Sequence, residues 1–508
     1  MGGAARRCYP PAMSAPVVTT QYGPVSGRTE DGVSRFFGIP YAAAPVGRLR
    51  FRAPEAHPGW DEVRDASALG PNAPHAIKAF PGLDVEPIVG AGWRKGDDYL
   101  NLNIWAPERL AADPLRPVMV FIHGGGFVIG SNYAAVQDGT AFARSGVVMI
   151  AINYRMGIDG FLPIPGVPTN LGLRDMLFAL GWVRENAASF GGDPDNVTVF
   201  GESAGAMAIA NLIASPLAGG LFRRAIVESG HGRMVRDIDV AQRLVKKMAK
   251  LLGVPPTAAG FRSTSFEDCI AAVEKVSLPT TRVNLRDGDG HEPVYGISRF
   301  IPVWGDDVLP QKPVDALHAG AGAEVDLLIG TNAEEMNLYL VPTGVRDKVG
   351  SLLATFVLSR SMPRARQALK AYGLGQKGKK PGQALTDAMN DLVFRWPARV
   401  YAAAHKGRTH FYELDWGSDA FGGQLGASHG MELPFVFDTL PSVTGPQGLA
   451  GEQPPQALAD RVHRLWVDFA TDGRLPWQEY DAATRQVYQL QRGEAVFEPV
   501  MPAAAFIS

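Results

Sequence analysis

The pentapeptide Gly201-Glu202-Ser203-Ala204-Gly205 places the strongest local constraint on what this chain can fold into. It directly follows the apolar run 197–200 and directly precedes residues 206–213, which are compatible with a helix. A serine at such a strand–turn–helix junction is typical of a nucleophile elbow, where flanking glycines leave room for a strained serine. The alternative is a chance match among 58 glycines. The elements on both sides argue against chance and predict an exposed hydroxyl above the first turn of a helix.

Strand-like and helix-like segments alternate over most of the chain. Continuous apolar runs of this kind suit strands covered by helices on both faces, so the pattern predicts an α/β protein. The strands are expected at residues 118–122, 147–152, 197–200, 225–227, 326–329 and 410–414. The helices are expected at 170–189, at 244–252 before Gly253, from 266 after a Ser265 cap, after a Thr386 cap, and at 458–471 before Gly473. Residues 93–96, 373–382 and 444–455 are expected to be loops.

The amino-acid composition argues against nucleic-acid and membrane partners. The 508 residues include 49 Lys and Arg against 51 Asp and Glu, so the chain has no electrostatic footprint for nucleic acid. Lys377, Lys379 and Lys380 are interpreted as a solvated loop, because three charges make little field. The apolar runs are far shorter than the ~20 residues that cross a bilayer. We expect no nucleic-acid partner and no membrane partner.

Two cysteines, Cys8 and Cys269, are too few for a disulfide framework or a zinc site. Residues 1–18 contain two arginines but no apolar stretch of signal-peptide length. We therefore expect residues 1–16 to be a disordered extension, residues 17–508 to form a single domain, and the protein to be cytoplasmic.

A serine nucleophile needs a base, and in this type of fold the order along the chain is serine, acid, histidine. Of the ten histidines, His429 alone among those well after Ser203 lies in a loop of small residues, 426–430. The acid should follow the strand 326–329, where Glu334 and Glu335 are both candidates.

Backbone donors for a tetrahedral oxyanion are predicted in His123-Gly124-Gly125-Gly126, which follows the strand 118–122. Each such donor is worth on the order of 10²–10³ in rate. Nucleotide binding is the rival reading of these glycines, but the next strand ends at Asn153 without an acidic residue for a ribose. The spacing of His429 and Glu432 does not match a zinc-protease helix.

In the combination of these motifs, the chain resembles the bacterial type-B carboxylesterases, the para-nitrobenzyl-esterase and cholinesterase-like branch of the α/β-hydrolases. The resemblance runs from about Tyr22 to about Pro476. It is carried by residues 38–41, 45–51, 97–103, 153–155, 170–175, 179–183 and, most specifically, 190–205.

The resemblance implies an α/β-hydrolase fold with a central, mostly parallel, twisted sheet and helical insertions that form a lobe over an active-site gorge. It implies a catalytic triad of Ser203, Glu335 and His429, although Met336 stands where glycine is usual, which keeps Glu334 open. It further implies an oxyanion hole from Gly125, Gly126 and Ala204, with Glu202 and Ser229 behind the histidine. Many relatives carry a disulfide where this chain has Ala73 and Tyr99, which suits a reducing compartment.

The implied activity is serine-dependent hydrolysis of small-molecule carboxylic esters through an acyl-enzyme intermediate, with no metal or other cofactor. Amides, carbamates or thioesters are alternatives on the same triad, and a non-catalytic binding protein is the alternative from another class. Candidate walls of the substrate pocket are Phe127, Trp93, Met207, Met234, Phe300 and Phe435. No tryptophan matches the choline-binding position, so acetylcholine is not favoured.

Overall fold

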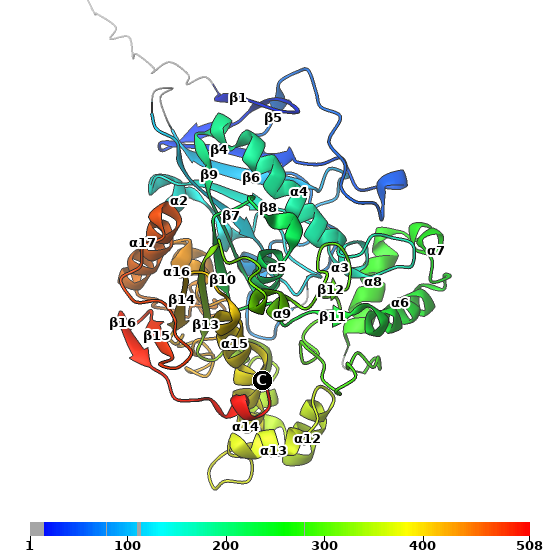
Figure 1. Cartoon of the computed structure of the whole chain (residues 1–508), viewed down its shortest axis with the longest axis vertical. Helices are drawn as coiled ribbons and strands as arrows, with labels where there is room; N and C mark the ends of the chain where they lie inside the picture. The colour runs from blue at the N-terminus through cyan, green and yellow to red at the C-terminus, as the bar shows by residue number, and fades with distance from the viewer. Residues whose placement is uncertain (1–14, 78, 109–112, 279, 508) are drawn as a thin grey trace, which may run out of the picture.

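The computed structural model describes residues 15–77, 79–108, 113–278 and 280–507, and within these ranges eleven strands form one central sheet (Figure 1). Neighbouring strands run in the order β16 (Glu494–Phe497), β15 (Gln486–Gln489), β14 (Thr409–Leu414), β13 (Asp326–Asn332), β10 (Arg224–Glu228), β9 (Gly192–Glu202), β7 (Arg116–Ile122), β8 (Val148–Ile152), β6 (Asn101–Pro107), β4 (Val33–Pro40) and β3 (Arg28–Glu30). The strands from β15 to β8 pair in parallel, and both edges are antiparallel. The predicted mostly parallel α/β sheet is confirmed.

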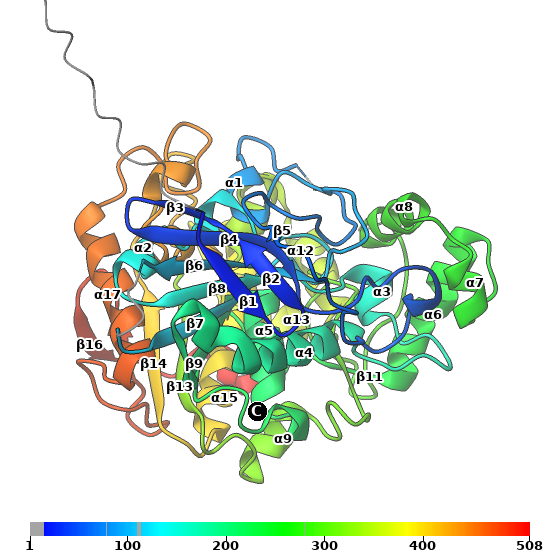
Figure 2. The same cartoon turned by 90° about the horizontal axis from the view of Figure 1, so that it is seen from above.

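Successive side chains along each strand point to opposite faces of the sheet, so the core has two parts, one on each face. On β7, Val118, Val120 and Ile122 enter one apolar cluster, whereas Met119 and Phe121 enter the other. The first cluster packs under α4 (Leu171–Asn186) and α5 (Ala204–Ile213). The second packs under α2 (Thr140–Arg144) and α17 (Gln456–Asp472). Figure 2 shows these two helix layers on opposite sides of the strands.

The predicted strands are all present, with different ends. The strand expected at 197–200 extends over Gly192–Glu202, and the one expected at 326–329 continues to Asn332. These extensions contain Gly, Asp and Asn, which an apolar pattern does not include. The strands β4 and β6 were not predicted.

Three of the helix predictions are confirmed at their ends. Helix α6 (Ile238–Leu252) ends at Gly253 with φ +69°, and α17 ends at Gly473 with φ +75°. Helix α8 (Phe266–Ser277) begins after Ser265, whose Oγ accepts the amide of Asp268 at 3.0 Å.

The predicted Thr386 cap is wrong. Thr386 lies inside α14 (Pro381–Met389), where its Oγ1 donates to the carbonyl of Gly382. The helix starts earlier because Pro381 suits the first helical position, where no amide hydrogen is needed. The loop expected at 373–382 therefore ends at Lys380.

Helical insertions interrupt the succession of strands, as the resemblance implied. Between β10 and β13 lie α6, α7 (Ala258–Arg262) and α8, which project on one side of the molecule in both views (Figures 1 and 2). Between β13 and β14 lie α12 (Ser351–Ser359), α13 (Ala365–Ala371) and α14, at the lower end of Figure 1. A π-helix, Asn390–Arg395, joins α14 to α15 (Trp396–Ala404).

Most of the expected N-terminal extension, residues 1–14, lies outside the described residues, and β1 begins at Val17. Among the helices described, none is long and apolar enough to cross a bilayer.

Candidate active site

Ser203 stands at the turn between β9 and α5 with φ +53° and ψ −118°, a conformation that L-residues seldom adopt. Its amide donates to the carbonyl of Glu228 at 2.9 Å. The flanking glycines are needed because β7 passes very close. A Cβ on Gly205 would lie 1.9 Å from the carbonyl oxygen of Ile122, and one on Gly201 would lie 2.5 Å from the same atom. The strained elbow expected from the sequence is present.

The carboxylate that bonds the His429 ring is that of Glu335. His429 Nδ1 donates to Glu335 Oε2 at 2.6 Å, and the His429 amide donates to the Glu335 carbonyl at 3.2 Å. The other carboxylate oxygen, Oε1, accepts the amide of Asn332 at 2.8 Å. Both side chains are buried. Glu334 instead accepts the amide of Ala427 at 3.1 Å, so it braces the loop that carries the histidine.

The other ring nitrogen of His429 faces Glu202. Nε2 lies 3.0 Å from Glu202 Oε1, and neither atom has a well-aligned hydrogen bond among the described residues. No hydrogen bond in the described part of the chain joins the Ser203 hydroxyl to the ring. Burial by itself lowers the pKa of His429, but the charges of Glu202 and Glu335 raise it to about 9. Burial raises the pKa of Glu202 to about 8, against the opposing effect of His429.

Ser229 bonds a buried carboxylate near the histidine, that of Glu432, which the sequence analysis considered only as part of a rejected zinc motif. Ser229 Oγ donates to Glu432 Oε1 at 3.2 Å, and Asn332 Nδ2 donates to the other oxygen of the same carboxylate. Burial, with the nearby charge of Glu335, raises the pKa of Glu432 to about 7. Glu432 is the one charged residue in the apolar segment 431–437, a pattern that signals a buried, hydrogen-bonded carboxylate.

The glycine loop leaves backbone donors available beside the serine. Gly125 and Gly126 have φ of +99° and +62°, and a Cβ on Gly124 would lie 3.1 Å from Ser203 Cβ. The amides of Gly125, Gly126 and Ala204 have no acceptor within the described residues. Three unmatched amide donors at a strained serine are the arrangement that an oxyanion hole requires.

Hydrogen bonds hold the peptide planes of this loop. His123 Nδ1 donates to the carbonyl of Gly124 at 2.9 Å, and Tyr154 donates to the carbonyl of His123 at 2.9 Å while its ring stacks on the imidazole. Ser298 Oγ donates to the carbonyl of Gly126 at 2.6 Å. Because an amide N–H points opposite to the preceding carbonyl, the bond to the Gly124 carbonyl also fixes the direction of the Gly125 N–H.

The candidate pocket walls Met207 and Phe127 belong to one apolar cluster of the core, and Phe435 belongs to the other. Met207 lies one helical turn after Ser203, and its amide donates to the Ser203 carbonyl at 2.8 Å. Phe127 is fully buried, with its ring 4.4 Å from that of Phe161. The Phe435 ring packs on that of Trp416, in the apolar cluster that does not contain Met207, so its place in the pocket stays a prediction.

The remaining candidates are also mostly enclosed. Met234 and Phe300 are fully buried. Trp93 lies between Phe266 and the Lys95 ammonium.

Two aromatic side chains that the sequence did not single out flank the histidine. The ring centroid of Phe394, in the π-helix, lies 4.6 Å from that of His429, and Tyr339, in α10 (Asn337–Leu340), lies at 5.7 Å. The π-helix also binds the acid loop, because Asn390 Oδ1 accepts the amide of Met336 at 2.7 Å. No set of three or more His, Cys, Asp or Glu side chains in the described ranges could hold a metal ion.

Comparison with known proteins gives consistent matches along the chain. The family model described as "Carboxylesterase family" matches residues 14–501. The para-nitrobenzyl esterase of Bacillus subtilis (strain 168) is 34% identical over 493 residues, which cover 93% of this chain and 94% of that protein. The phenmedipham hydrolase of Pseudarthrobacter oxydans is 33% identical over 479 residues, covering 91% of each.

Solved structures match over similar lengths. A PNB esterase structure superposes with a TM-score of 0.80 at 33% identity, covering 95% of this chain and 96% of the other. A Geobacillus stearothermophilus carboxylesterase at pH 6.2 gives a TM-score of 0.81 at 32% identity, covering 96% and 99%.

Proposed function

The chain belongs to the carboxylesterase family and is a carboxylic ester hydrolase, and we propose that it acts through an acyl-enzyme intermediate on Ser203. The observation that carries this mechanism is the 2.6 Å bond between Glu335 and His429 beside a serine at a strained elbow. A carboxylate–imidazole pair of this kind is the base that a serine hydroxyl needs.

In the proposed reaction, Ser203 Oγ attacks the acyl carbon while His429 Nε2 takes the hydroxyl proton. Glu335 holds the Nδ1 tautomer and stabilises the imidazolium. The amides of Gly125, Gly126 and Ala204 bind the oxyanion, and His429 then protonates the leaving alcohol. Water activated by His429 attacks the acyl carbon, which releases the acid and regenerates Ser203.

The resting geometry adds one step to this scheme. His429 Nε2 lies 3.0 Å from Glu202 Oε1, and the hydrogen bond from the Ser203 hydroxyl to Nε2 is proposed to form when the substrate binds, with Nδ1 held on Glu335. Catalytic hydrogen bonds that are absent or long without substrate and form in the complex are common in hydrolases.

We further propose a reducing, cytoplasmic setting. Cys269 is a buried free thiol, and Ala73 and Tyr99, both buried, stand where many relatives have a disulfide. The name of one relative makes para-nitrobenzyl esters a reasonable first substrate class to test.

The nucleophile is tested with Ser203→Ala. We expect kcat for a p-nitrophenyl ester to fall by a factor on the order of 10⁴ or more, because the remaining groups provide no covalent route. An organophosphate should label the unmodified protein at Ser203 and leave the variant unlabelled. The control is Ser277→Ala, an exposed serine at the end of α8, which should leave kcat unchanged. Full activity of Ser203→Ala would refute the acyl-enzyme on Ser203. Failure of the label to attach, together with no ester turnover by the unmodified protein, would favour a binding protein.

The acid is tested with a matched pair, Glu335→Gln and Glu334→Gln. We expect Glu335→Gln to lower kcat by a factor on the order of 10³–10⁴, because the His429 tautomer is no longer held. Glu334→Gln should cost less than about tenfold, since it only weakens a brace on the loop. The reverse ranking would transfer the role to Glu334.

A further inference from the structure

Helix α12 presents an apolar face to solvent. Leu352, Leu353, Phe356 and Val357 are 90%, 52%, 59% and 38% exposed, and their spacing places them on one side of the helix. The opposite side, with Ala354 and Leu358, is buried against the protein. Exposed apolar side chains occur singly on most proteins, whereas a contiguous group marks an interaction surface.

The surroundings of this helix are strongly basic. Residues 343–380 contain nine Lys and Arg but one acidic residue, Asp347, in a chain where the two kinds are almost equal in number. The basic residues are Arg346, Lys348, Arg360, Arg364, Arg366, Lys370, Lys377, Lys379 and Lys380. Seven of them are exposed, and Arg346 and Lys379 are partly so. The loop lysines, which alone make little field, belong to this larger set.

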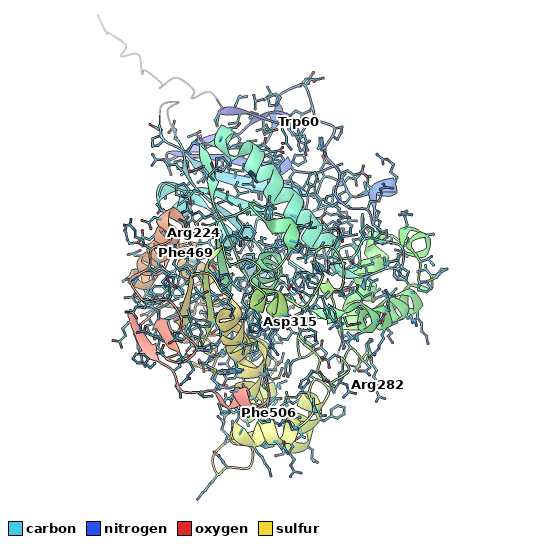
Figure 3. All side chains as sticks on the ribbon, in the orientation of Figure 1. Trp60, Arg224, Arg282, Asp315, Phe469 and Phe506 are labelled. Carbon is cyan, nitrogen blue, oxygen red and sulfur yellow. The ribbon has the colours of Figure 1, made fainter. Side chains whose placement is uncertain are left out.

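The apolar and basic features lie at one end of the molecule. Helices α12 and α13 form the lower end in Figure 1, remote from β1. Phe506, labelled in Figure 3, lies in the same region, and the Arg364 guanidinium stacks over its ring at 5.1 Å. We refer to the exposed face of α12 with the basic residues of 343–380 as the α12 surface.

We propose that the α12 surface binds an anionic lipid surface. Leucine and phenylalanine side chains supply the apolar contact with acyl chains, and the surrounding Lys and Arg supply attraction to the headgroups. A helix that lies on a bilayer needs no spanning length, so this docking does not conflict with the absence of a span among the described helices. It does replace the expectation of no membrane partner, which rested on the length of the apolar runs alone.

Charge argues against a second copy of the chain as the occupant. In a two-fold dimer the same patch meets itself. This would bring the nine basic residues of one copy, of which Lys379 and Lys380 are paired with Asp387 and Asp347, against the same set in the other. An anionic bilayer places the opposite charge against the same side chains. The inference is independent of the proposed hydrolysis, because it concerns residues outside the triad.

The first test is flotation of the full chain with vesicles. We expect binding to vesicles of phosphatidylcholine with about one third phosphatidylglycerol, at least tenfold weaker binding to phosphatidylcholine alone, and weakening by salt. Absence of binding to the anionic vesicles would overturn the proposal.

The second test changes each half of the surface. The double variant Leu352→Ser, Phe356→Ser should reduce partitioning at least tenfold, while Phe497→Ser, which removes a 70%-exposed ring from β16, should not change it. Arg366→Gln and Lys370→Gln, on α13, should each reduce it about fivefold. All variants should keep the unfolding midpoint and the hydrolysis of a soluble ester.

Two results of this second test would overturn the assignment. One is unchanged vesicle binding by the double serine variant. The other is loss of a dimer by that variant, seen by sedimentation velocity, without vesicle binding by the unmodified chain. The α12 surface would then be a contact between two copies.

Discussion

Glu202 is the residue that most directly sets the properties of the proposed base. Its carboxylate lies 3.0 Å from His429 Nε2, on the side of the ring opposite to Glu335. Both carboxylates favour the imidazolium, yet only Glu335 is bonded to it in a way that orients the ring. Glu202 therefore affects the pH at which the neutral imidazole forms, and Glu335 fixes the orientation of the ring.

This division predicts a pH effect for Glu202→Gln. The neutral ring is the active form of the base, so the acidic limb of kcat/KM follows the pKa of His429. The negative charge of Glu202 helps to raise that pKa to about 9, and removal of the charge must lower it. We expect the midpoint of the acidic limb to move to lower pH, because Glu202 is the charge that raises the pKa of His429 most.

The measurement is kcat/KM for a soluble ester across pH. Glu432→Gln provides a graded comparison, because Glu432 contributes less to the pKa of His429 than Glu202 does. It should shift the limb in the same direction by a smaller amount. A midpoint that stays in place or moves to higher pH in Glu202→Gln would show that the neighbouring charge does not govern the base.

At the level of elements, apolar runs predicted the central strands because those strands are buried on both faces. Strand β6 escaped this criterion although it is also buried, because Asn101 and Asn103 interrupt the run. Their amides are satisfied by distant residues, with Asn103 Nδ2 donating to the carbonyl of Asn132 at 2.9 Å and Asn153 Nδ2 donating to Asn101 Oδ1 at 3.1 Å. A sequence pattern does not reveal such long-range partners.

The same limit explains which parts of the site were missed. Ser203, His429 and the glycine loop lie in short local motifs, which is why the sequence alone could single them out. Phe394, whose ring lies beside that of His429, belongs to a π-helix, and an apolar periodicity carries no signal for one added residue per turn. Functional sites are where such irregular turns are frequent.

The close approach of α5 to β7 gives a prediction at this scale. Gly205→Ala would place a Cβ 1.9 Å from the Ile122 carbonyl, so the first turn of α5 must move and carry the Ala204 amide with it. We expect kcat to fall by about 100-fold or more, the value of an oxyanion donor, and stability to fall by about 1–3 kcal/mol.

The matched control is Gly181→Ala, within α4. A Cβ there has nothing within 4 Å, so the variant should stay fully active and gain about 0.5–1 kcal/mol from helix propensity. Activity and urea midpoints of the two variants provide the measurement. Wild-type turnover by Gly205→Ala would mean that the elbow tolerates the displacement.

At the scale of the whole molecule, we propose that residues 17–508 form one folding unit. The length alone permits two or more domains. Support for a single unit comes from side chains that join distant segments through the core. Ser203, Glu335 and His429 follow β9, β13 and β14, which lie in the same sheet, and Trp466 of α17 donates to Glu228 Oε1 of β10 at 2.6 Å.

The buried ion network around Arg399 allows this proposal to be tested. Arg399, on α15, donates to both oxygens of Glu498, which follows the last strand, at 2.6 Å each, and to Glu413 of β14 at 2.9 Å. The pair with Glu498 is almost fully buried, so Glu498→Gln removes a charge that compensates a cation in a medium of low dielectric. We expect a loss of about 3 kcal/mol, because a buried charge deprived of a partner is costly.

In a single folding unit, that loss must lower the urea midpoint equally in both probes, tryptophan fluorescence and esterase activity. Glu267→Gln is the control, since the Glu267–Lys95 pair is more than half exposed and should leave the midpoint unchanged. If Glu498→Gln instead separates the curve into two transitions, with activity lost in only one of them, the C-terminal segment folds apart from the rest. If activity is lost in the transition at the lower urea concentration, the network supports the site locally, through α15 and the π-helix that carries Phe394.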